Sequence, residues 1–184
     1  MFVVTYKGKF AFIKPWTAIR DGETFSQQFL TPSIIEGIEK KLFPDTLNNI
    51  GIHKILRHKL KYSTMDSQQE VVQTRGWKKK NKMLLRERSV LKRSVLLNPI
   101  LQIAFENYED ACTASTQHIC LCRNEDILLP SNEIIELSIS EFDKLAGFEL
   151  RFGDNNQSFL VGYNRFNSNL PMYGWLEYSG QSLL

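Results

Sequence analysis

The sequence predicts an α+β fold in which an antiparallel sheet carries two helices on one face and a basic loop or hairpin projects from it. Three observations predict this class. Short segments of alternating, β-branched or aromatic residues recur along the chain, which is typical of strands. Two segments carry the start signals of helices. A cation-rich stretch between the strands lacks apolar periodicity, and 184 residues with 42% hydrophobic content suit a single domain spanning 1–184.

The N-terminal part predicts strands followed by a helix. Phe2 to Tyr6 alternates like a strand, and Gly8 to Pro15 continues as a second short strand or a bend before a polar loop. Thr31 is a suitable N-cap for a helix with Pro32 at its first position. Apolar residues then recur at helical spacing, at Ile34, Ile35, Ile38 and Leu42. A second proline, Pro44, ends the helical pattern.

The middle of the chain predicts three further strands around a protrusion. Ile50 to Leu60 is expected to be a strand. The next segment, Tyr62 to Lys82, has little apolar periodicity, and we expect a protruding loop or hairpin there, inserted like a thumb. Ser89 to Val95 and Ile100 to Glu106 predict two more strands, separated by a turn at the Asn-Pro pair between them.

The C-terminal part predicts a second helix and further short strands. Ile119 to Cys122 is expected to be a strand. Ser140 to Asp143 resembles a capping box, and the spacing of Phe142, Leu145 and Ala146 predicts a helix that reaches Glu149. The last strand and a short apolar end follow at Phe159 to Phe166 and Tyr173 to Tyr178. This order of strands and helices is that of a ferredoxin-like or RRM-like domain, whose open sheet face commonly binds RNA.

Charge is distributed unevenly along the chain. Between Gly51 and Arg93 there are thirteen cations and three acids, a local charge of 13 − 3 = +10, although the whole chain carries only +3. Between Glu106 and Gln157 there are eleven acids and three cations, or 3 − 11 = −8. Concentrated positive charge speeds the capture of a polyanion, and phosphate contacts supply sequence-independent affinity for nucleic acid. We expect an acidic face from Glu106 to Asp154 that docks onto basic neighbours or keeps nucleic acid off that side.

An indole stands among cations within the basic stretch. Trp77 follows an arginine and precedes a run of lysines, which suits phosphates with a stacked base. Trp16 suits the same role, and a rim aromatic that covers the core is an equal alternative. The candidate RNA-binding residues are Lys14, Trp16, Arg20, Arg57, Lys59, Arg75, Trp77, Lys78, Lys79, Lys80, Lys82, Arg86, Arg88 and Lys92. The alternative for these cations is a solvated loop and sheet face that only keep the protein soluble.

The residues present favour a cytoplasmic protein without a metal or cofactor. No run approaches the roughly 18 apolar residues of a membrane span, and the N-terminus lacks a signal-peptide layout. Three cysteines leave one unpaired, which indicates a reducing environment. Cys120 and Cys122 with His118 are too few ligands for a metal site. We therefore expect buried thiols, no metal, no cofactor and no membrane partner.

The sequence does not predict a catalytic residue. RNA cleavage through the 2′-OH needs a general base, a general acid and stabilisation of the developing charge. His53 and His58 are expected on opposite faces of one strand, so they would not act on one phosphate together. His58 stands among Arg57, Lys59 and Lys61 and could contact a phosphate, but an exposed polar histidine is the expectation we favour. His118 lies near an acidic stretch and is a poorer base. Tyr62 and Tyr163 are more simply explained as packed or stacked aromatics.

Several motifs occur in a specific order along the chain. Gly8-Lys-Phe-Ala-Phe12 precedes Thr31-Pro-Ser-Ile-Ile-Glu-Gly37, and Glu87 to Glu106 follows. The series is completed by Phe148 to Phe152, Gln157 to Phe166 and Tyr173 to Tyr178. Over most of the chain this order resembles the RAMP-superfamily CRISPR-associated subunit that caps the 5′ end of the guide RNA in Cascade-type complexes (class 1, type I). The later segments are most similar to the type I-C branch.

The resemblance implies a binding role within a ribonucleoprotein complex. It implies that the chain holds the 5′ handle of a CRISPR RNA, contacts the backbone subunits and the large subunit, and meets target DNA only indirectly. The thumb would pack against a neighbouring backbone subunit. The type I-C branch often also cuts precursor guide RNA with a tyrosine and a Lys-His pair. Here Phe43 stands near the expected tyrosine, and Phe142-Asp143-Lys144 lacks the histidine.

We therefore expect a CRISPR RNA-binding subunit of an antiviral surveillance complex. One alternative is a metal-independent endoribonuclease that matures precursor crRNA, which a specific cut of repeat RNA in EDTA would favour. A second alternative is an RRM-like protein-interaction module without an RNA role. Mutual burial of the basic and acidic faces in a self-associating species would favour that module.

Overall fold

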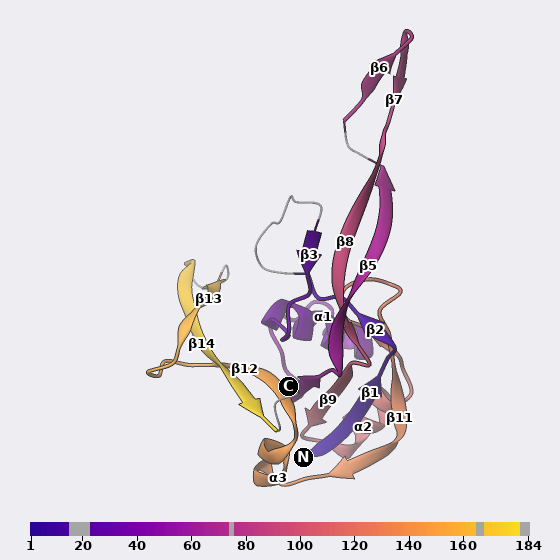
Figure 1. Ribbon diagram of the computed structural model, residues 1–184. Coiled ribbons are helices and arrows are strands. Elements are labelled where there is room, and N and C mark those ends of the chain that lie inside the picture. Colours follow the sequence, from indigo (N-terminus) through magenta and orange to yellow (C-terminus); the bar gives the residue numbers. More distant parts are fainter. Residues whose placement is uncertain (15–22, 74–75, 165–167, 181–184) are drawn as a thin grey trace.

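The structure is a computed structural model that describes residues 1–14, 23–73, 76–164 and 168–180. Within these residues, eight strands form one sheet, helices lie on both of its faces, and a long hairpin projects from the body (Figure 1). Trp16, Arg20 and Arg75, three of the candidate RNA-binding residues, lie outside the described residues. The predicted α+β class with a mostly antiparallel sheet is confirmed.

The centre of the body is built from four strands and two helices. Along the chain these are β1 (Phe2–Lys7), α1 (Pro32–Leu42), β4 (Ile55–Lys61), β9 (Ile100–Phe105), α2 (Tyr108–Ser115) and β11 (Ile127–Glu136). In the sheet the strands lie in the order β11, β1, β9, β4, and each neighbouring pair is antiparallel. β1 and β9 are therefore the central pair, β11 flanks β1, and β4 flanks β9.

Alternation along β1 separates the two faces of this sheet. Val4 and Tyr6 point to the face covered by α1 and α2, where the main hydrophobic core lies. The Tyr6 hydroxyl donates a hydrogen bond of 2.7 Å to the carbonyl of Ala114 on α2, and burial raises the pKa of this phenol. Val3 points to the opposite face, where Phe142 from α3 (Ile139–Lys144) covers it. Two helices thus share one face, and the third lies on the other.

The helix that shares a face with α1 is α2, whereas we expected it to be the helix behind Ser140. That helix, α3, packs on the other face and ends at Lys144, so Glu149 belongs to a strand instead. The N-cap is Ser138, not Ser140. The Ser138 hydroxyl accepts a hydrogen bond from the Glu141 N–H, and the Glu141 carboxylate accepts one from the Ser138 N–H at 2.8 Å. The capping box therefore begins two residues earlier than expected.

Strand β4 begins at Ile55, later than the expected start at Ile50. Glu39 on α1 is almost fully buried, and its carboxylate accepts hydrogen bonds from three backbone N–H groups at 2.7–2.9 Å. The donors are the N–H groups of His53, Lys54 and Ile55. Because this carboxylate takes the donors of the segment before the strand, that segment forms a bend instead of extending the ladder.

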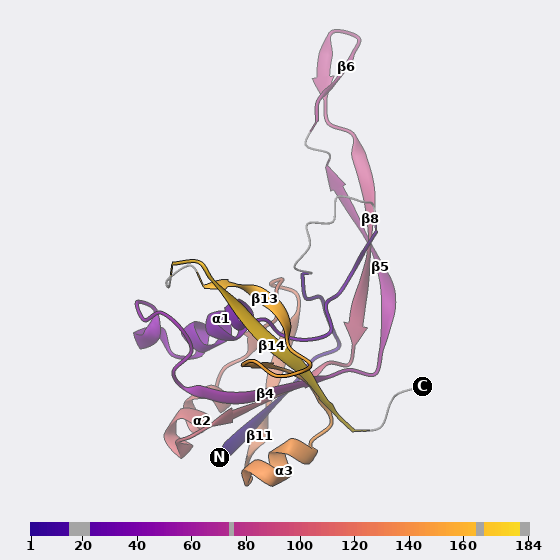
Figure 2. The same ribbon diagram turned by 90° about the vertical axis from the view of Figure 1, so that its left-hand side faces the viewer.

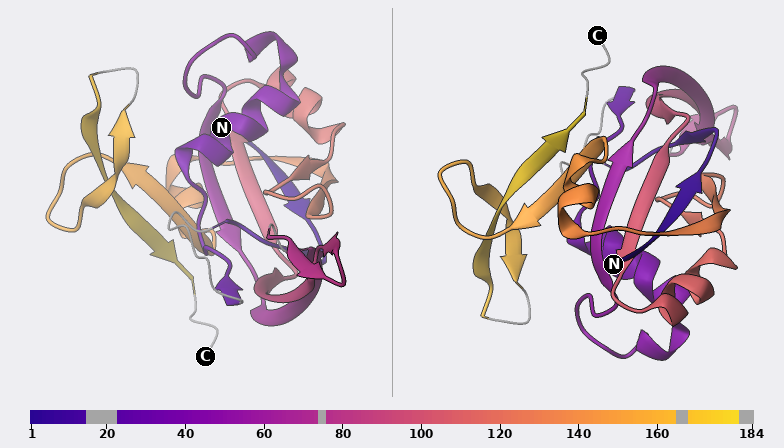
Figure 3. Two further views of the ribbon diagram at one scale, coloured as in Figure 1. Left: turned by 90° about the horizontal axis from the view of Figure 1, so that it is seen from above. Right: turned by 90° about the horizontal axis from the view of Figure 1, so that it is seen from below.

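Three C-terminal strands extend the sheet beyond β4. These are β12 (Gly147–Phe152), β13 (Phe159–Asn164) and β14 (Leu170–Ser179), and they stand to one side of the body (Figure 3). Between β12 and β4 only Phe148 and Leu60 are paired in register. β14 has ten residues, whereas we expected a short apolar end. At the other edge lies β10 (Ile119–Cys120), which is shorter than the expected strand.

A second, smaller sheet forms the long hairpin. This sheet contains β2 (Phe10–Ala11), β3 (Glu23–Phe25), β5 (Thr64–Gln73) and β8 (Arg88–Leu97). At the far end of the hairpin, β6 (Lys78–Lys80) and β7 (Met83–Leu85) pair with each other as a separate two-stranded sheet. We call residues 64–97 the thumb. It rises away from the body in both side views (Figures 1 and 2). A protruding hairpin was expected to end at Lys82, but Lys82 lies in the turn at its tip, and β8 is the returning arm.

The cysteines contribute little to the core. All three are free thiols, with Cys112 and Cys120 half-buried and Cys122 exposed, so the expectation of buried thiols is wrong for Cys122.

In the described part of the chain, no group of three or more His, Cys, Asp and Glu side chains is arranged to hold a metal ion. No helix there is long and apolar enough to span a membrane.

Candidate nucleic-acid interface

The thumb is a regular antiparallel ladder that alternates between an exposed and a half-buried face. β5 and β8 are in register from Thr64 opposite Leu97 to Gln73 opposite Arg88. Ten residues at about 3.4 Å each make these strands roughly 30 Å long. Arg88 and Lys92 are exposed on the outer face, because residues four apart on a strand share a face, whereas Arg93 points to the half-buried face.

The base of the thumb is fixed by two arginines around one aromatic ring. The guanidinium groups of Arg93 and Arg123 lie 5.1 and 5.5 Å from the centroid of the Phe12 ring. Arg93 forms an ion pair of 2.6 Å with Glu70 on the neighbouring strand. Arg123 binds the fully buried Asp126 at 2.6 Å. These contacts anchor the hairpin to the body, and both arginine charges are paired with carboxylates.

The tip of the thumb is a tight two-residue turn. Asn81 and Lys82 join β6 to β7, and both have positive φ angles, of 49° and 67°. Two central residues in this region are the mark of a type I′ turn, whose twist matches that of paired strands. Asn is favoured at such a position, but a lysine there is uncommon. The turn therefore presents the Lys82 side chain at the far end of the molecule.

The tip combines exposed cations with one exposed indole. Trp77 is 57% exposed, and the guanidinium of Arg86 lies 4.5 Å from its ring centroid. The exposed cations of the distal thumb are Lys78, Lys79, Lys80, Lys82, Arg86, Arg88 and Lys92. Glu87 forms an ion pair with Lys78 at 2.7 Å, but both side chains are largely exposed, so this pair contributes little to stability.

The distal thumb has a high positive charge density. Residues 77–92 contain seven cations and the single acid Glu87, a local charge of 7 − 1 = +6. The exposed faces of the hairpin thus combine cationic side chains with an exposed aromatic ring. Such a combination binds single-stranded nucleic acid, in which bases stack on aromatic rings while cations follow the backbone.

The structure removes two predicted residues from the candidate interface. Arg57 binds Glu149 through two hydrogen bonds of 2.6 Å and Asp143 through one of 2.9 Å. Lys59 is fully buried, and its ammonium donates to the Asp143 and Leu145 carbonyls and to the Ser179 hydroxyl at 2.5–2.9 Å. Because these donors are used inside the protein, neither side chain is available to a phosphate.

Of the remaining candidates, Lys14 lies apart from the tip. It is exposed and follows Ile13, whose N–H donates to the Ser26 hydroxyl at 2.9 Å near the base of the thumb. The residues that the structure brings together are those of the thumb, namely Trp77, Lys78, Lys79, Lys80, Lys82, Arg86, Arg88 and Lys92. One interface is therefore supported among the described residues, and it lies on the hairpin rather than on the body.

The opposite charges of the two chain halves partly neutralise each other within the body. Lys54 forms an ion pair with Asp110, and Arg57 forms pairs with Asp143 and Glu149. In each case a cation of the basic stretch meets acids of the acidic stretch. The expected acidic face is therefore wrong in part, because several of its carboxylates are internal partners. The positive charge that stays exposed is concentrated on the thumb.

The open sheet face that an RRM-like domain uses for RNA is partly occupied here. α3 covers β1 and β9 through Phe142, and the same aromatic ring lies near the cations of Arg57 and Lys59, at 5.1 and 5.8 Å. These side chains fill the face beside α3 with internal contacts. The sheet is therefore a poorer platform for stacked bases than the thumb.

The histidines are not arranged for RNA cleavage. All three lie outside the thumb, at positions 53, 58 and 118. His58 is buried instead of exposed, and burial together with the nearby Arg57 lowers its pKa to about 4. The Nε2 of His53 contacts the Ile50 carbonyl at 3.0 Å. Tyr62 stacks on Phe148 with ring centroids 6.2 Å apart, as a packed aromatic does.

Sequence reasoning missed the exposed apolar strand of the thumb tip. Met83, Leu84 and Leu85 are exposed on β7 opposite the three lysines of β6. Three consecutive apolar residues after a lysine run were visible in the sequence, but without the hairpin they resemble an ordinary core segment. Their exposure adds a surface that a partner protein can cover.

The comparisons with known proteins do not assign a family. Neither a scan against protein-family models nor a search of curated proteins finds a match to the chain.

Proposed function

We propose that the protein is an RNA-binding subunit that holds the 5′ handle of a CRISPR RNA within a Cascade-type complex. The observation that carries RNA binding is the distal thumb, with a local charge of +6 around the exposed Trp77. A polyanion with unstacked bases matches this surface better than a duplex does, because the indole can stack only on a splayed base. The choice of a guide handle rests on the order of motifs that resembles the RAMP superfamily.

The proposal includes a ferredoxin-like, RRM-like unit at the centre of the body. The strand order β11, β1, β9, β4 and the two helices on one face support it, since they follow the βαββαβ pattern. The additional strands β10, β12, β13 and β14 extend this unit at its two edges. The thumb is inserted between β4 and β9, the second and third strands of the pattern.

The exposed apolar residues of the tip support a protein contact beside the RNA. Met83, Leu84 and Leu85 would pack against a neighbouring backbone subunit while the lysines on β6 hold the RNA that passes between the subunits. A contact of this kind buries apolar side chains that are costly to leave in water. The thumb would then serve protein and RNA at once.

The proposal is tested by RNA binding over a salt series. Purified protein is titrated with a type I-C CRISPR repeat RNA and with a scrambled RNA of equal length, in buffers from low to physiological salt. A preference for the repeat that persists at physiological salt supports handle binding. Equal and steeply salt-dependent binding of both RNAs would reduce the function to general RNA capture, and no binding of either RNA would contradict the proposal.

A further inference from the structure

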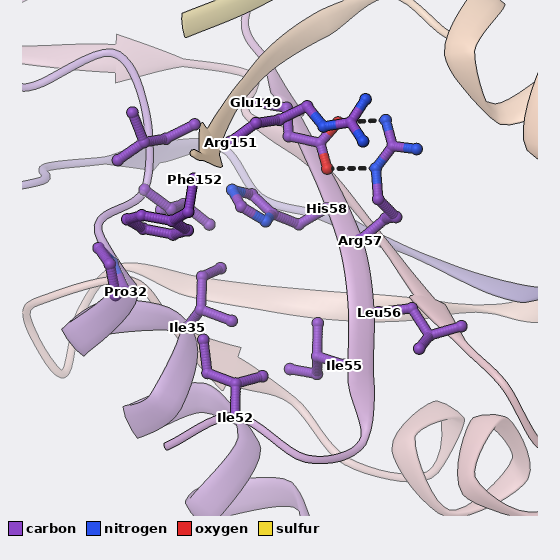
Figure 4. A pocket seen from close by; sticks show the side chains of 12 residues that line it. Pro32, Ile35, Ile52, Ile55, Leu56, Arg57, His58, Glu149, Arg151 and Phe152 are labelled. Atoms are coloured by element: carbon purple, nitrogen blue, oxygen red, sulfur yellow. Dashed lines mark hydrogen bonds and ion pairs between the residues drawn. The ribbon is translucent and has the colours of Figure 1, made fainter. Parts of the chain in front are cut away.

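A pocket lies between the start of α1, the segment before β4, and β12 (Figure 4). Its volume is about 270 Å³, slightly below the range of roughly 300–1,000 Å³ that is usual for small-molecule sites. Apolar side chains from three separate parts of the chain line about half of it, namely Pro32, Ile35, Ile52, Ile55 and Phe152, and the polar side chains of Arg57, His58, Glu149 and Arg151 line the rest. This size and lining suit a single small ring system rather than an extended ligand.

His58 contributes an unpaired polar atom to this pocket. The imidazole extends from β4 toward Phe152 (Figure 4), and only 7% of the residue is exposed. Its Nε2 is buried without a hydrogen-bond partner. Buried polar atoms are almost always paired, and leaving one unpaired is costly. A ligand that hydrogen-bonds to Nε2 would remove this cost.

The charges around the pocket are already balanced. Arg57 is paired with Glu149, and Arg151 donates a hydrogen bond of 3.0 Å to Glu177. His58 itself is neutral at pH 7, because burial holds its pKa at about 4. An ionised ligand would lose its hydration here without meeting a free opposite charge. The lining therefore favours a neutral ligand.

We propose that this pocket binds a neutral heteroaromatic ring of nucleobase size, with His58 Nε2 hydrogen-bonded to the edge of the ring. The face of the ring packs on Phe152 and on the aliphatic side chains of the opposite wall. A nucleobase such as adenine carries both donors and acceptors on its edges, so it pairs with Nε2 in either tautomer of His58. The ring belongs either to a free base or to a base in an RNA strand, and both share this chemistry.

The first measurement is a titration of adenine into 15N-labelled protein, followed at the ring nitrogens of histidine by NMR. We expect the His58 signals to shift with saturation, while those of the exposed His118 stay in place. In a matched pair of variants, His58→Phe keeps a planar ring without the nitrogen and weakens adenine binding about 10-fold or more. His118→Phe makes the same change at an exposed histidine and binds adenine like the wild type.

A second variant keeps the proposal testable if His58→Phe does not fold. Ile52 lines the pocket and is 36% exposed, so Ile52→Trp fills the pocket from its solvent side without replacing a core residue. Loss of adenine binding in this variant supports the site. The same variants are then titrated with single-stranded oligoadenylate. A parallel loss identifies a base within a strand, and a loss confined to adenine identifies a free base. Unshifted His58 signals at millimolar adenine, or wild-type binding in both variants, overturn the proposal.

Discussion

Arg57 and Glu149 are 92 residues apart in the chain and are joined by two hydrogen bonds of 2.6 Å between the guanidinium and both carboxylate oxygens. The pair connects β4 to β12, where the ladder itself has a single pair of residues in register. Two parallel bonds between an arginine and a carboxylate are strong and directional. They fasten the C-terminal strands to the body where backbone pairing is weakest.

Replacing Arg57 by methionine is expected to lower the free energy of unfolding by roughly 3–5 kcal/mol, because it leaves the nearly buried Glu149 carboxylate without its partner. Chemical denaturation measures the change. The double variant Arg57→Met with Glu149→Leu removes both charges and is expected to recover much of the loss. Lys78→Met breaks an exposed pair and serves as the control, with a cost of about 1 kcal/mol or less. An equally small cost for Arg57→Met would contradict this role.

The stability of the protein is expected to depend on pH through His58. Burial lowers its pKa to about 4 in the folded protein, against roughly 6.5 in an unfolded chain. Between about pH 4 and pH 6.5, the His58 imidazole takes up a proton when the protein unfolds. The contribution is therefore complete above about pH 6.5 and is lost progressively as the pH falls toward 4, by on the order of 3 kcal/mol. Denaturation at a series of pH values between 7.5 and 4.5 measures this slope.

The comparison of two histidine variants isolates the effect of His58. His58→Phe is expected to flatten the pH dependence between about 4 and 6.5 relative to the wild type, since phenylalanine binds no proton. Carboxylates contribute equally to both proteins, so they cancel in the difference. His118→Phe is expected to keep the wild-type slope, because that histidine is exposed. Equal slopes for all three proteins would show that His58 is not held neutral by burial.

Trp77 is expected to supply a stacking surface for RNA. Trp77→Ala should weaken binding of a fluorescent single-stranded RNA by about 1–3 kcal/mol, the usual value for one stacked base, while Trp77→Phe retains part of that energy. Fluorescence anisotropy measures the affinities. Tyr163 is a matched control, because it is 59% exposed and lies on β13, away from the thumb. Similar losses in Trp77→Ala and Tyr163→Ala would contradict a specific role for the thumb.

Local signals in the sequence predicted the elements whose residues carry strong patterns. α1 begins at Pro32 and ends before Pro44, as the N-cap and the helical spacing indicate. The ends of β8 and β9 lie within two residues of the predicted strand ends. The boundary between them could be predicted because Asn98, with φ of 48°, forms a turn between two apolar strands. In these segments local preference and tertiary packing agree.

Other elements were missed because their local signal is weak or misleading. α2 buries only Ala111 and Ala114, and two small residues produce little apolar periodicity. β11 contains Pro130, which suggests a turn in sequence. In the structure this proline lies at a register shift opposite Tyr6, where the ladder tolerates the missing N–H.

The candidate site could be predicted in part for a similar reason. The lysine run and Trp77 are local in sequence, and the hairpin holds them together at one end. Arg57 and Lys59 had the same residue types in the same basic stretch, but their partners lie about 84–120 residues away in the chain. Pairing at that distance depends on how β4 meets β12 and α3, which no local pattern indicates.

If the thumb captures RNA through phosphate contacts, the salt dependence of binding must change when its lysines are removed. Lys78, Lys79, Lys80 and Lys82 are replaced together by glutamine. The control replaces four exposed lysines of the body instead, Lys7, Lys9, Lys41 and Lys144. Each phosphate contact on a single strand contributes about 0.7 to the slope of log K against log salt.

The affinity of both variants and the wild type for one repeat RNA is measured from about 50 to 200 mM salt. We expect the thumb variant to bind more weakly and its slope to be shallower by up to about 3, while the body variant keeps nearly the wild-type slope. An unchanged slope in the thumb variant, or an equal decrease in the body variant, would contradict RNA capture by the thumb.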